Sequence, residues 1–167
     1  QQGRPIDVII GDGDSISQAA REHNEHCFVR DGDQNTTDSE KAIRYCQQHG
    51  AKLIILLGGF GGRLDHTMSQ MRLLYRYHNP RCSIVAYNHN ETLRVIRNQA
   101  LTLCGSPGQH MALMGAPIAT VDAPDLTYAC HQLKIGYGYR ESTSNSIKQQ
   151  RTHIEVQGSA FLITDHT

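Results

Sequence analysis

The chain has 167 residues, and 16 Lys and Arg residues balance 16 Asp and Glu residues to give a formal net charge of zero. This length suits one domain of generous size or two small ones. The neutral balance argues against the basic surface that nucleic-acid-binding proteins carry. The longest apolar run, residues 53–57, is far shorter than the roughly 20 residues that span a bilayer. We therefore expect neither a nucleic-acid partner nor a membrane.

Five cysteines lie at irregular, wide spacings, and none belongs to a Cys-x-x-Cys pair. An odd number in this arrangement favours free thiols in a reducing compartment over a disulfide framework. Since no secretion signal is visible, the sequence predicts a cytoplasmic protein.

The first half of the chain alternates apolar β-branched runs with helical segments. Strands are predicted at 6–10, 28–29, 53–57 and 83–87, and helices at 15–26, 38–49 and 65–78. Thr37 and Glu40 form a capping box that begins the second helix, and Gly50 ends it. This alternation predicts parallel strands, whose ligands bind beyond the carboxyl ends of the strands.

After Asn88 the pattern changes to short strand-like pieces separated by turn residues. They lie at 92–97, 100–103, 111–114, 118–121, 133–139 and 153–156. Such spacing predicts an antiparallel sandwich. The sequence therefore predicts an α/β fold in two domains: a parallel-sheet nucleotide-binding domain over residues 1–88, then a small antiparallel β-sandwich domain over residues 89–167.

Three polar clusters in the first half carry residues suited to phosphate chemistry. They are GDGDS at 11–15, DQNTTDSEK at 33–41 and GGFGGRLDH at 58–66. Asp12 and Asp14 can converge on a hard cation such as Mg²⁺. A glycine-rich turn between a strand and a helix lets backbone amides approach a phosphate, and Lys41 and Arg63 would add positive charge. Together the clusters indicate phosphoryl or pyrophosphoryl transfer.

Each cluster also has a simpler interpretation. A lone Asp-x-Asp is usually turn chemistry, and an acid at a helix start, such as Asp38, needs no ligand. A lone glycine-rich turn is more often a tight turn than a phosphate cradle. The functional interpretation rests on all three clusters following parallel strands or opening the helices beside them.

These clusters, together with Ser142-Thr143-Ser144-Asn145, resemble the motifs of the thiamine pyrophosphokinase family, GDxDS, DQxxTDxxK, GxxGRxDH and STSN. Their order and spacing match from about residue 5 to the end of the chain. The resemblance implies an enzyme that transfers pyrophosphate from ATP to the hydroxyl of thiamine, giving thiamine diphosphate and AMP, with Mg²⁺ as cofactor. It also implies an α/β domain followed by a β-sandwich, in a homodimer with sites between subunits.

The resemblance assigns roles position by position. The catalytic residues would be Asp12, Asp14, Asp38 and Asp65. The first three would also be the metal ligands, while the fourth would bind metal or accept the hydroxyl proton. The residues contacting ATP phosphates would be Gly59, Gly61, Gly62, Lys41 and Arg63. The residues contacting thiamine would be Gln34, Tyr128, Ser142 and Asn145.

The chain departs from the family pattern in three places. Residues 125–128 read Asp-Leu-Thr-Tyr where the family has GLKW or GLKY, and Asn35 replaces an acid. An acid-and-glycine segment that normally precedes GDxDS would lie before residue 1, so we expect the N-terminal segment of the α/β domain to be missing. Two alternatives stay open: a non-catalytic nucleotide- or thiamine-binding module, and a Mg²⁺-dependent phosphohydrolase that uses Asp12 and Asp14.

Overall fold

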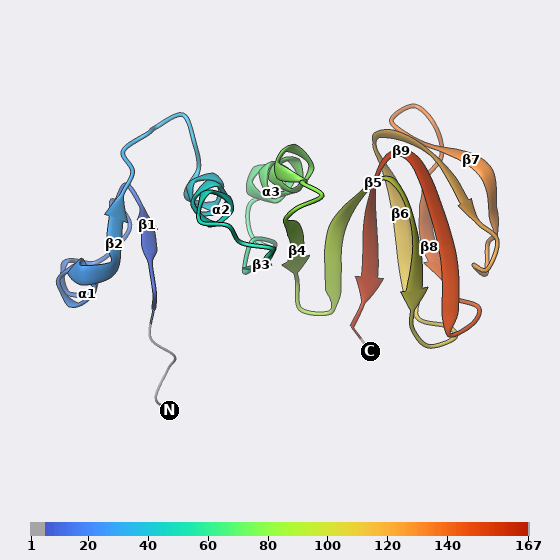
Figure 1. The fold of residues 1–167 in the computed structure, drawn as a ribbon, viewed down its shortest axis with the longest axis horizontal. Coiled ribbons are helices and arrows are strands. Elements are labelled where there is room, and N and C mark those ends of the chain that lie inside the picture. The colour runs from blue at the N-terminus through green and yellow to red at the C-terminus, as the bar shows by residue number, and fades with distance from the viewer. Residues whose placement is uncertain (1–5, 167) are drawn as a thin grey trace. The chain divides into compact units, whose positions relative to one another are not determined.

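The computed structural model describes residues 6–166 of the chain (Figure 1). Its contacts divide the chain after Lys52 into two compact units, residues 1–52 and residues 53–167. None of the helices within residues 6–166 is both long enough and apolar enough to cross a bilayer. All five cysteines are free thiols, which confirms the prediction from their number and spacing.

The first unit combines two short parallel strands with two helices. Its elements are β1 (Ile9–Gly11), α1 (Gln18–His23), the 3-10 turn η1 (Glu25–Cys27), β2 (Phe28–Arg30) and α2 (Asp38–Gln48). β1 and β2 pair in parallel, with Ile9 opposite Phe28. α1 is shorter than predicted because Asn24 ends it: the Asn24 side-chain amide donates to the Ala20 carbonyl at 2.7 Å, in competition with helical continuation.

The start of α2 confirms the Thr37 half of the predicted capping box. Thr37 lies at the N-cap, and its Oγ1 accepts the Glu40 N–H at 3.2 Å. The helix anchors the unit through Ile43, whose side chain is fully buried. Beyond its end, Gly50 adopts a φ of 78°, the left-handed conformation that glycine supplies after a helix. Both ends of this helix could therefore be predicted from local chemistry.

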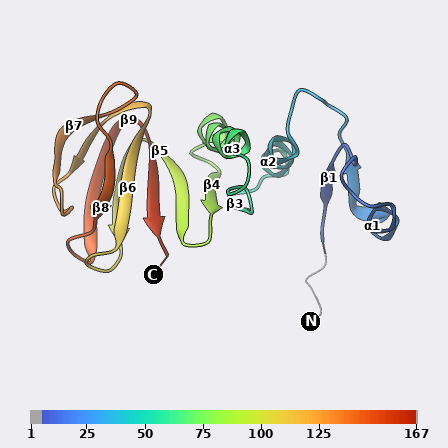
Figure 2. The same cartoon turned by 180° about the vertical axis from the view of Figure 1, so that it is seen from behind.

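The second unit is a seven-stranded sheet with one helix. Its elements are β3 (Leu53–Leu57), α3 (Leu64–Tyr77), β4 (Ser83–Tyr87), β5 (Glu91–Cys104), β6 (His110–Ala123), β7 (Cys130–Gly136), β8 (Ser142–Ser146) and β9 (Arg151–Asp165). The strand order is β3-β4-β5-β9-β6-β7, and β8 also pairs with β6. β3 and β4 run parallel, and the other pairings described in this sheet are antiparallel. Figure 2 shows β5, β9 and β6 side by side.

Bulges bend the long strands over a single core. The β5–β9 register shifts next to Asn98, whose φ is 44° and whose Oδ1 accepts the Gly158 N–H at 2.7 Å. The β6–β9 register shifts between Gly115 and Ala119. Residues from both sides of these bulges share one buried cluster, for example Ile154 before the bend along β9 and Leu162 after it. The bulges therefore fold one sheet onto itself.

The fold is a mixed α/β fold, as predicted, but its main sheet is mostly antiparallel. The predicted parallel strands occur as two pairs, β1 with β2 and β3 with β4. β4 is also hydrogen-bonded to β5, with Val85 opposite Arg94. The predicted boundary between residues 88 and 89 therefore falls at the turn joining these two paired strands, whereas the two compact units meet after Lys52 in the sequence. The predicted sandwich takes the form of one continuous bent sheet.

Candidate functional site

The turn after β1 holds a carboxylate whose environment favours its ionised form. Asp12 Oδ1 accepts the Asp14 N–H at 3.0 Å. This bond is the main cause that holds the pKa of the Asp12 carboxyl below its usual value, and the Gln34 side chain and the positive charge of Lys41 lower the pKa further. The Asp14 side chain is exposed. The first unit thus gathers side chains from the β1 turn, the 31–36 loop and α2.

A buried lysine lies beside the first acid of α2. Lys41 Nζ is 3.3 Å from Asp38 Oδ1, and the side chains of Lys41 and Asp38 are 2% and 54% exposed. The Asp38 carboxylate also rests against the end of β1, since a Cβ on Gly11 would lie 3.1 Å from Asp38 Oδ1. The absence of a side chain at position 11 therefore allows this acid to approach the strand end that carries Asp12 and Asp14.

Asp33 organises the adjoining loop, a role that the sequence analysis missed. Its Oδ1 accepts the Asn35 N–H at 2.9 Å, and its Oδ2 accepts the Thr36 hydroxyl at 3.1 Å. The Asn35 N–H is the main cause of a lowered pKa of the Asp33 carboxyl. The Asn35 side chain also donates to Asp33 Oδ1 at 3.2 Å. Asn35, which stands where the family has a second acid, therefore helps to hold the loop in place.

In the second unit, a glycine-rich loop leads from β3 into α3. Gly58, Gly61 and Gly62 have φ values of 71°, 90° and 96°, and this left-handed backbone explains why glycine is needed. Gly59 does not share that conformation. A Cβ on Gly61 or Gly62 would meet no atom within 4 Å. The backbone at those two positions is therefore open to a ligand.

Arg63 and Asp65 form a two-pronged ion pair at the start of α3. Arg63 Nε donates to Asp65 Oδ1 at 3.1 Å, and a terminal guanidinium nitrogen donates to Oδ2 at 2.6 Å. The guanidinium holds the pKa of the Asp65 carboxyl below its usual range, and the His66 N–H adds to this effect. Both side chains of the pair are mostly exposed. Asp65 is accordingly an ionised carboxylate with its charge balanced by Arg63.

A cavity of about 240 Å³ lies beside the glycine-rich loop. Phe60, Gly61, Thr67 and Met71 line it from the loop and α3. The remaining lining residues come from β4, β5, their connection and β9, namely Ala86, Asn88, Glu91, Thr92, Leu93 and Ile163. This cavity is at the carboxyl end of β4, where ligands of parallel strands bind.

The residues predicted to contact thiamine differ sharply in exposure. Asn145 is 2% exposed and Ser142 is 7% exposed, whereas Tyr128 is 69% exposed. The Asn145 amide donates to the Tyr128 carbonyl at 2.8 Å and to Ser142 Oγ at 2.9 Å. Its Oδ1 accepts the N–H groups of Tyr128 at 3.0 Å and Ser146 at 2.9 Å. Asn145 therefore uses its full hydrogen-bonding capacity to hold the loop that presents Tyr128.

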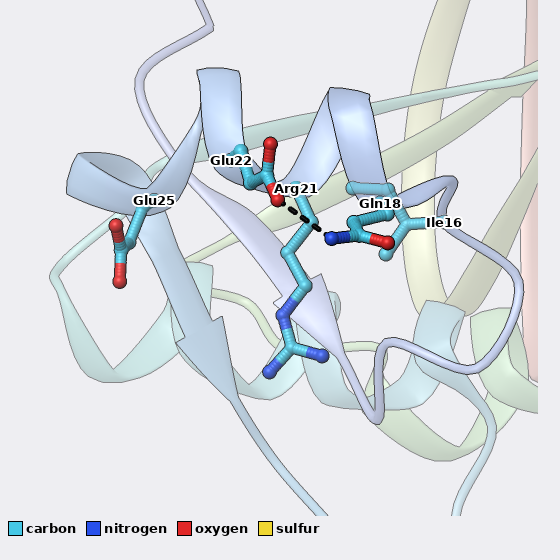
Figure 3. A pocket seen from close by; sticks show the side chains of 5 residues that line it. All are labelled: Ile16, Gln18, Arg21, Glu22 and Glu25. Atoms are coloured by element: carbon cyan, nitrogen blue, oxygen red, sulfur yellow. Dashed lines mark hydrogen bonds between the residues drawn. The ribbon is translucent and has the colours of Figure 1, made fainter.

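A separate hollow of about 470 Å³ lies on α1 in the first unit (Figure 3). Its lining residues are Ile16, Gln18, Arg21, Glu22 and Glu25. Gln18 Nε2 donates to Glu22 Oε1 at 2.8 Å, and Figure 3 shows Arg21 extending away from this pair. The lining includes none of the residues that the sequence singles out, so the hollow is not part of the candidate site.

The structure thus places the predicted residues in two groups, one in each unit. Asp12, Asp14, Gln34, Asp38 and Lys41 belong to the first unit, around the end of β1. The glycine-rich loop, the Arg63–Asp65 pair and the Tyr128 loop belong to the second. Carboxylates beside a buried lysine, and a glycine turn opening a helix, are features of proteins that bind phosphate esters together with a metal ion.

Comparison with known proteins identifies the family. Residues 1–86 match the family described as thiamin pyrophosphokinase, catalytic domain. Since this match covers more than half of the chain, the chain belongs to the thiamine pyrophosphokinase family.

Curated relatives extend the likeness along most of the chain. Thiamine pyrophosphokinase 1 of Oryza sativa subsp. japonica is 29% identical over 167 residues, covering 89% of this chain and 61% of the relative. Thiamine pyrophosphokinase 1 of Arabidopsis thaliana is 27% identical over 187 residues, covering 96% of this chain and 69% of the relative. The chain thus spans less than two thirds of the length of the rice protein.

Solved structures share the fold. The thiamine pyrophosphokinase of Bacillus subtilis superposes with a TM-score of 0.81 at 18% identity, covering 93% of this chain and 77% of that one. The Candida albicans enzyme gives a TM-score of 0.82 at 15% identity, covering 96% and 73%. At these identities the likeness establishes the fold.

Proposed function

We propose that this chain carries out thiamine pyrophosphokinase chemistry: transfer of pyrophosphate from ATP to the hydroxyl of thiamine. The alcohol oxygen attacks the β-phosphorus, the bond from that phosphorus to the oxygen bridging it to the α-phosphate breaks, and AMP leaves with the electron pair. The hydroxyl proton passes to a base or to water. The observation that carries the proposal is the group of Asp12, Asp38 and Lys41 at the end of β1.

The donor set in the first unit fits Mg²⁺. Asp12, Asp14 and Asp38 offer hard carboxylate oxygens, and Mg²⁺ binds through one or two such groups together with substrate phosphates. When bound, Mg²⁺ would supply positive charge to the polyphosphate. Lys41 is buried beside Asp38, so its ammonium is a fixed positive charge that needs little rearrangement during the reaction.

Arg63 and the glycine-rich loop would provide the remaining contacts to phosphate. The loop backbone at Gly61 and Gly62 is open, and the α3 N-terminus follows it, a location that favours negative charge. Asp65 has a lowered pKa because of Arg63, which makes it a weaker base. Both carboxylate oxygens of Asp65 are also bonded to Arg63, so we assign Asp65 to holding Arg63 or a metal ion, in preference to accepting the hydroxyl proton.

Thiamine recognition would depend on Tyr128 and Gln34. Tyr128 offers an exposed aromatic ring, and such a ring attracts a cation such as the thiazolium of thiamine. Ser142 and Asn145 would act by positioning the loop that carries Tyr128. The Asn145 amide donates to the Tyr128 carbonyl, and its oxygen accepts the Tyr128 N–H. As the resemblance to the family implies, the active protein would be a cytoplasmic homodimer with sites shared between subunits.

The test combines a substrate assay with a matched pair of variants. Purified protein is incubated with ATP, Mg²⁺ and thiamine, and AMP is measured with and without thiamine. Release of AMP that requires thiamine supports the proposal. Phosphate release without thiamine would indicate a phosphohydrolase, and saturable binding without turnover would indicate a binding module.

Asp14→Asn should lower turnover by about 100-fold or more, as for loss of a charge-stabilising group. Because Asp14 is exposed, the free energy of unfolding should stay within about 1 kcal/mol of the unmodified chain. Asp7→Asn is the control, since Asp7 is also an exposed acid and lies outside the cluster. Near-normal turnover in Asp14→Asn would exclude the metal-binding role.

A further inference from the structure

Three ligand-type side chains meet on the sheet of the second unit, outside every motif in the sequence. They are Glu91, His110 and Asp165, and one ligand atom from each lies within 4.8 Å of those of the other two. His110 Nδ1 is 3.2 Å from Asp165 Oδ1. All three residues are half-buried. We call this group the sheet-end triad.

The strand register explains why these distant residues converge. Glu91 begins β5 and lies directly opposite Asp165 at the end of β9. His110 begins β6, and because Met111 pairs with Thr164, His110 is the next residue along toward Asp165. The three residues therefore form one row across three neighbouring strands. Side chains in such a row project from the same face of the sheet at close spacing.

The row lies beside the cavity of the candidate site. Leu93, two residues after Glu91, and Ile163, two residues before Asp165, lie opposite each other. They share the face of the triad because side chains alternate along strands. Both of them line the cavity, and so does Glu91 itself. The triad is therefore at the edge of a space that can admit a ligand.

The backbone around the triad is tied down on both sides. The Gln109 side chain donates to the Asp165 carbonyl at 2.8 Å. The His166 N–H donates to the Asn90 carbonyl at 2.7 Å, and the His166 ring stacks on Tyr87 with centroids 5.0 Å apart. These contacts tie the end of β9 to β4 and to the starts of β5 and β6, so the backbone that carries the three ligand groups is held in place.

The triad brings together two carboxylates and one imidazole, so its charge favours a cation. Two carboxylates are brought together, and within residues 6–166 the Glu91 carboxylate has no hydrogen-bond or ion-pair partner. One imidazole nitrogen with two carboxylate oxygens is a donor set typical of Zn²⁺ and similar transition metals, whereas Mg²⁺ prefers oxygen ligands alone. Three protein donors would also leave a coordination position for water or an anionic ligand group.

We infer that Glu91, His110 and Asp165 form a binding site for a divalent transition-metal ion such as Zn²⁺, separate from the carboxylates of the β1 turn. The inference stands independently of the proposed function, because it rests on residues of the second unit that none of the phosphate or thiamine assignments uses.

The test measures Zn²⁺ affinity by competition with a chromogenic chelator in the presence of excess Mg²⁺, which occupies the hard-oxygen sites. Every protein carries Cys104→Ser, since that exposed thiol would bind Zn²⁺ on its own. The variants are His110→Ala and Glu91→Gln. The control is His153→Ala, which removes an exposed histidine of β9 outside the triad.

Loss of one ligand should weaken Zn²⁺ binding by at least about tenfold in both triad variants, while His153→Ala binds as tightly as the parent. Zn²⁺ should also shift the NMR resonances of the His110 ring and leave those of His153 in place. Equal affinity in the parent and in His110→Ala, or an unmoved His110 ring at saturating Zn²⁺, would overturn the inference. Glu91→Gln separates loss of a ligand from misfolding. The Glu91 carboxylate has no partner in the described structure, so this change removes no contact of the fold.

Discussion

The turns of the first unit and strand β8 of the second unit use their motif polar groups in different ways. In the first unit, Asp12 and Asp33 accept N–H groups two residues further along the chain and stay partly open to solvent. In the second, Asn145 is almost fully buried, and its amide joins β8 to the loop that carries Tyr128, 17 residues away. Local turn bonds shape a surface that can receive a ligand, whereas the Asn145 bonds are part of the folded core. A motif residue is therefore best judged by the partners that its polar atoms already have.

The largest expected effect comes from Gly115→Ala in the second unit. A Cβ at this position would lie 2.5 Å from Gly136 Cα and from the Ile135 carbonyl oxygen. Because both atoms belong to the backbone, β6 and β7 would have to move apart, and we expect a loss of about 3 kcal/mol or more of unfolding free energy. Chemical denaturation followed by circular dichroism measures this loss.

Gly32→Ala in the first unit is the matched control for that experiment. A Cβ on Gly32 would meet nothing within 4 Å, so its unfolding free energy should change by less than about 0.5 kcal/mol. Equal destabilisation by the two variants would contradict the described packing of β6 against β7.

Asn145→Ala should destabilise the second unit by about 2–3 kcal/mol. The change removes the bonds to the Tyr128 N–H and carbonyl and to the Ser142 hydroxyl in a buried setting. Thr143→Ala, an exposed position on the same strand, should alter stability by less than about 0.5 kcal/mol. If Asn145→Ala unfolds at the same denaturant concentration as Thr143→Ala, the interpretation of Asn145 as a structural residue is wrong.

Gly11→Ala tests whether a change in the first unit lowers activity more than it lowers stability. Its Cβ would press on the Asp38 carboxylate at 3.1 Å, the end of a side chain that can move. Stability should therefore change by about 1 kcal/mol or less, while displacement of Asp38 should lower thiamine-dependent AMP release by about tenfold or more. Parallel denaturation and turnover measurements check both parts, and a stability loss as large as that of Gly115→Ala would contradict them.

The smallest effect concerns the exposed Arg63–Asp65 pair. Arg63→Gln should raise the pKa of the Asp65 carboxyl toward its ordinary value, because the guanidinium is the main cause of its lowering. Carbon-13 NMR of the carboxyl resonance measures the change. Arg63→Lys keeps the charge but loses the two-pronged geometry, so it should give an intermediate pKa. A pKa unchanged in Arg63→Gln would show that the pair does not persist in solution.

The sign of the pH dependence follows from the direction of that pKa. Since the carboxyl of Asp65 has a lower pKa when folded, its pairing favours the folded chain above the ordinary carboxyl pKa. This contribution disappears as the pH falls through the lowered value. Arg63→Gln should accordingly show a weaker pH dependence of the unfolding free energy in the acidic range, whereas the slope of that free energy against pH near neutrality should not change.

Elements governed by local chemistry could be predicted from the sequence. The Thr37 cap, the Gly50 stop and the β3 and β4 runs all depend on neighbours within a few residues, and the structure has them close to where they were predicted. The grouping of polar residues at the end of β1 could also be anticipated, because a strand end and a helix start are both visible in the sequence. The roles of those residues stay predictions.

Features that depend on long-range register could not be predicted in this way. The bulge at Asn98 interrupts the alternation of β5, so one strand resembles two, at 92–97 and 100–103. Strand β8 carries no strand signal, because its sequence, STSNS, has no apolar alternation, although Ser142 and Asn145 are buried. The sheet-end triad has no sequence signal, because only the pairing of β5, β9 and β6 brings its residues together.

The length of β5, β6 and β9 has a consequence for how the second unit unfolds. Each strand has 14 or 15 residues and passes through the bend into both halves of the sheet. Because β9 lies between β5 and β6 in both halves, detaching it from one half would also remove the strand that joins β5 and β6 in the other half. The sheet is therefore expected to open as one cooperative unit. Partly opened forms would expose long unpaired strand edges, through which β-proteins associate, and cooperative opening keeps such forms rare.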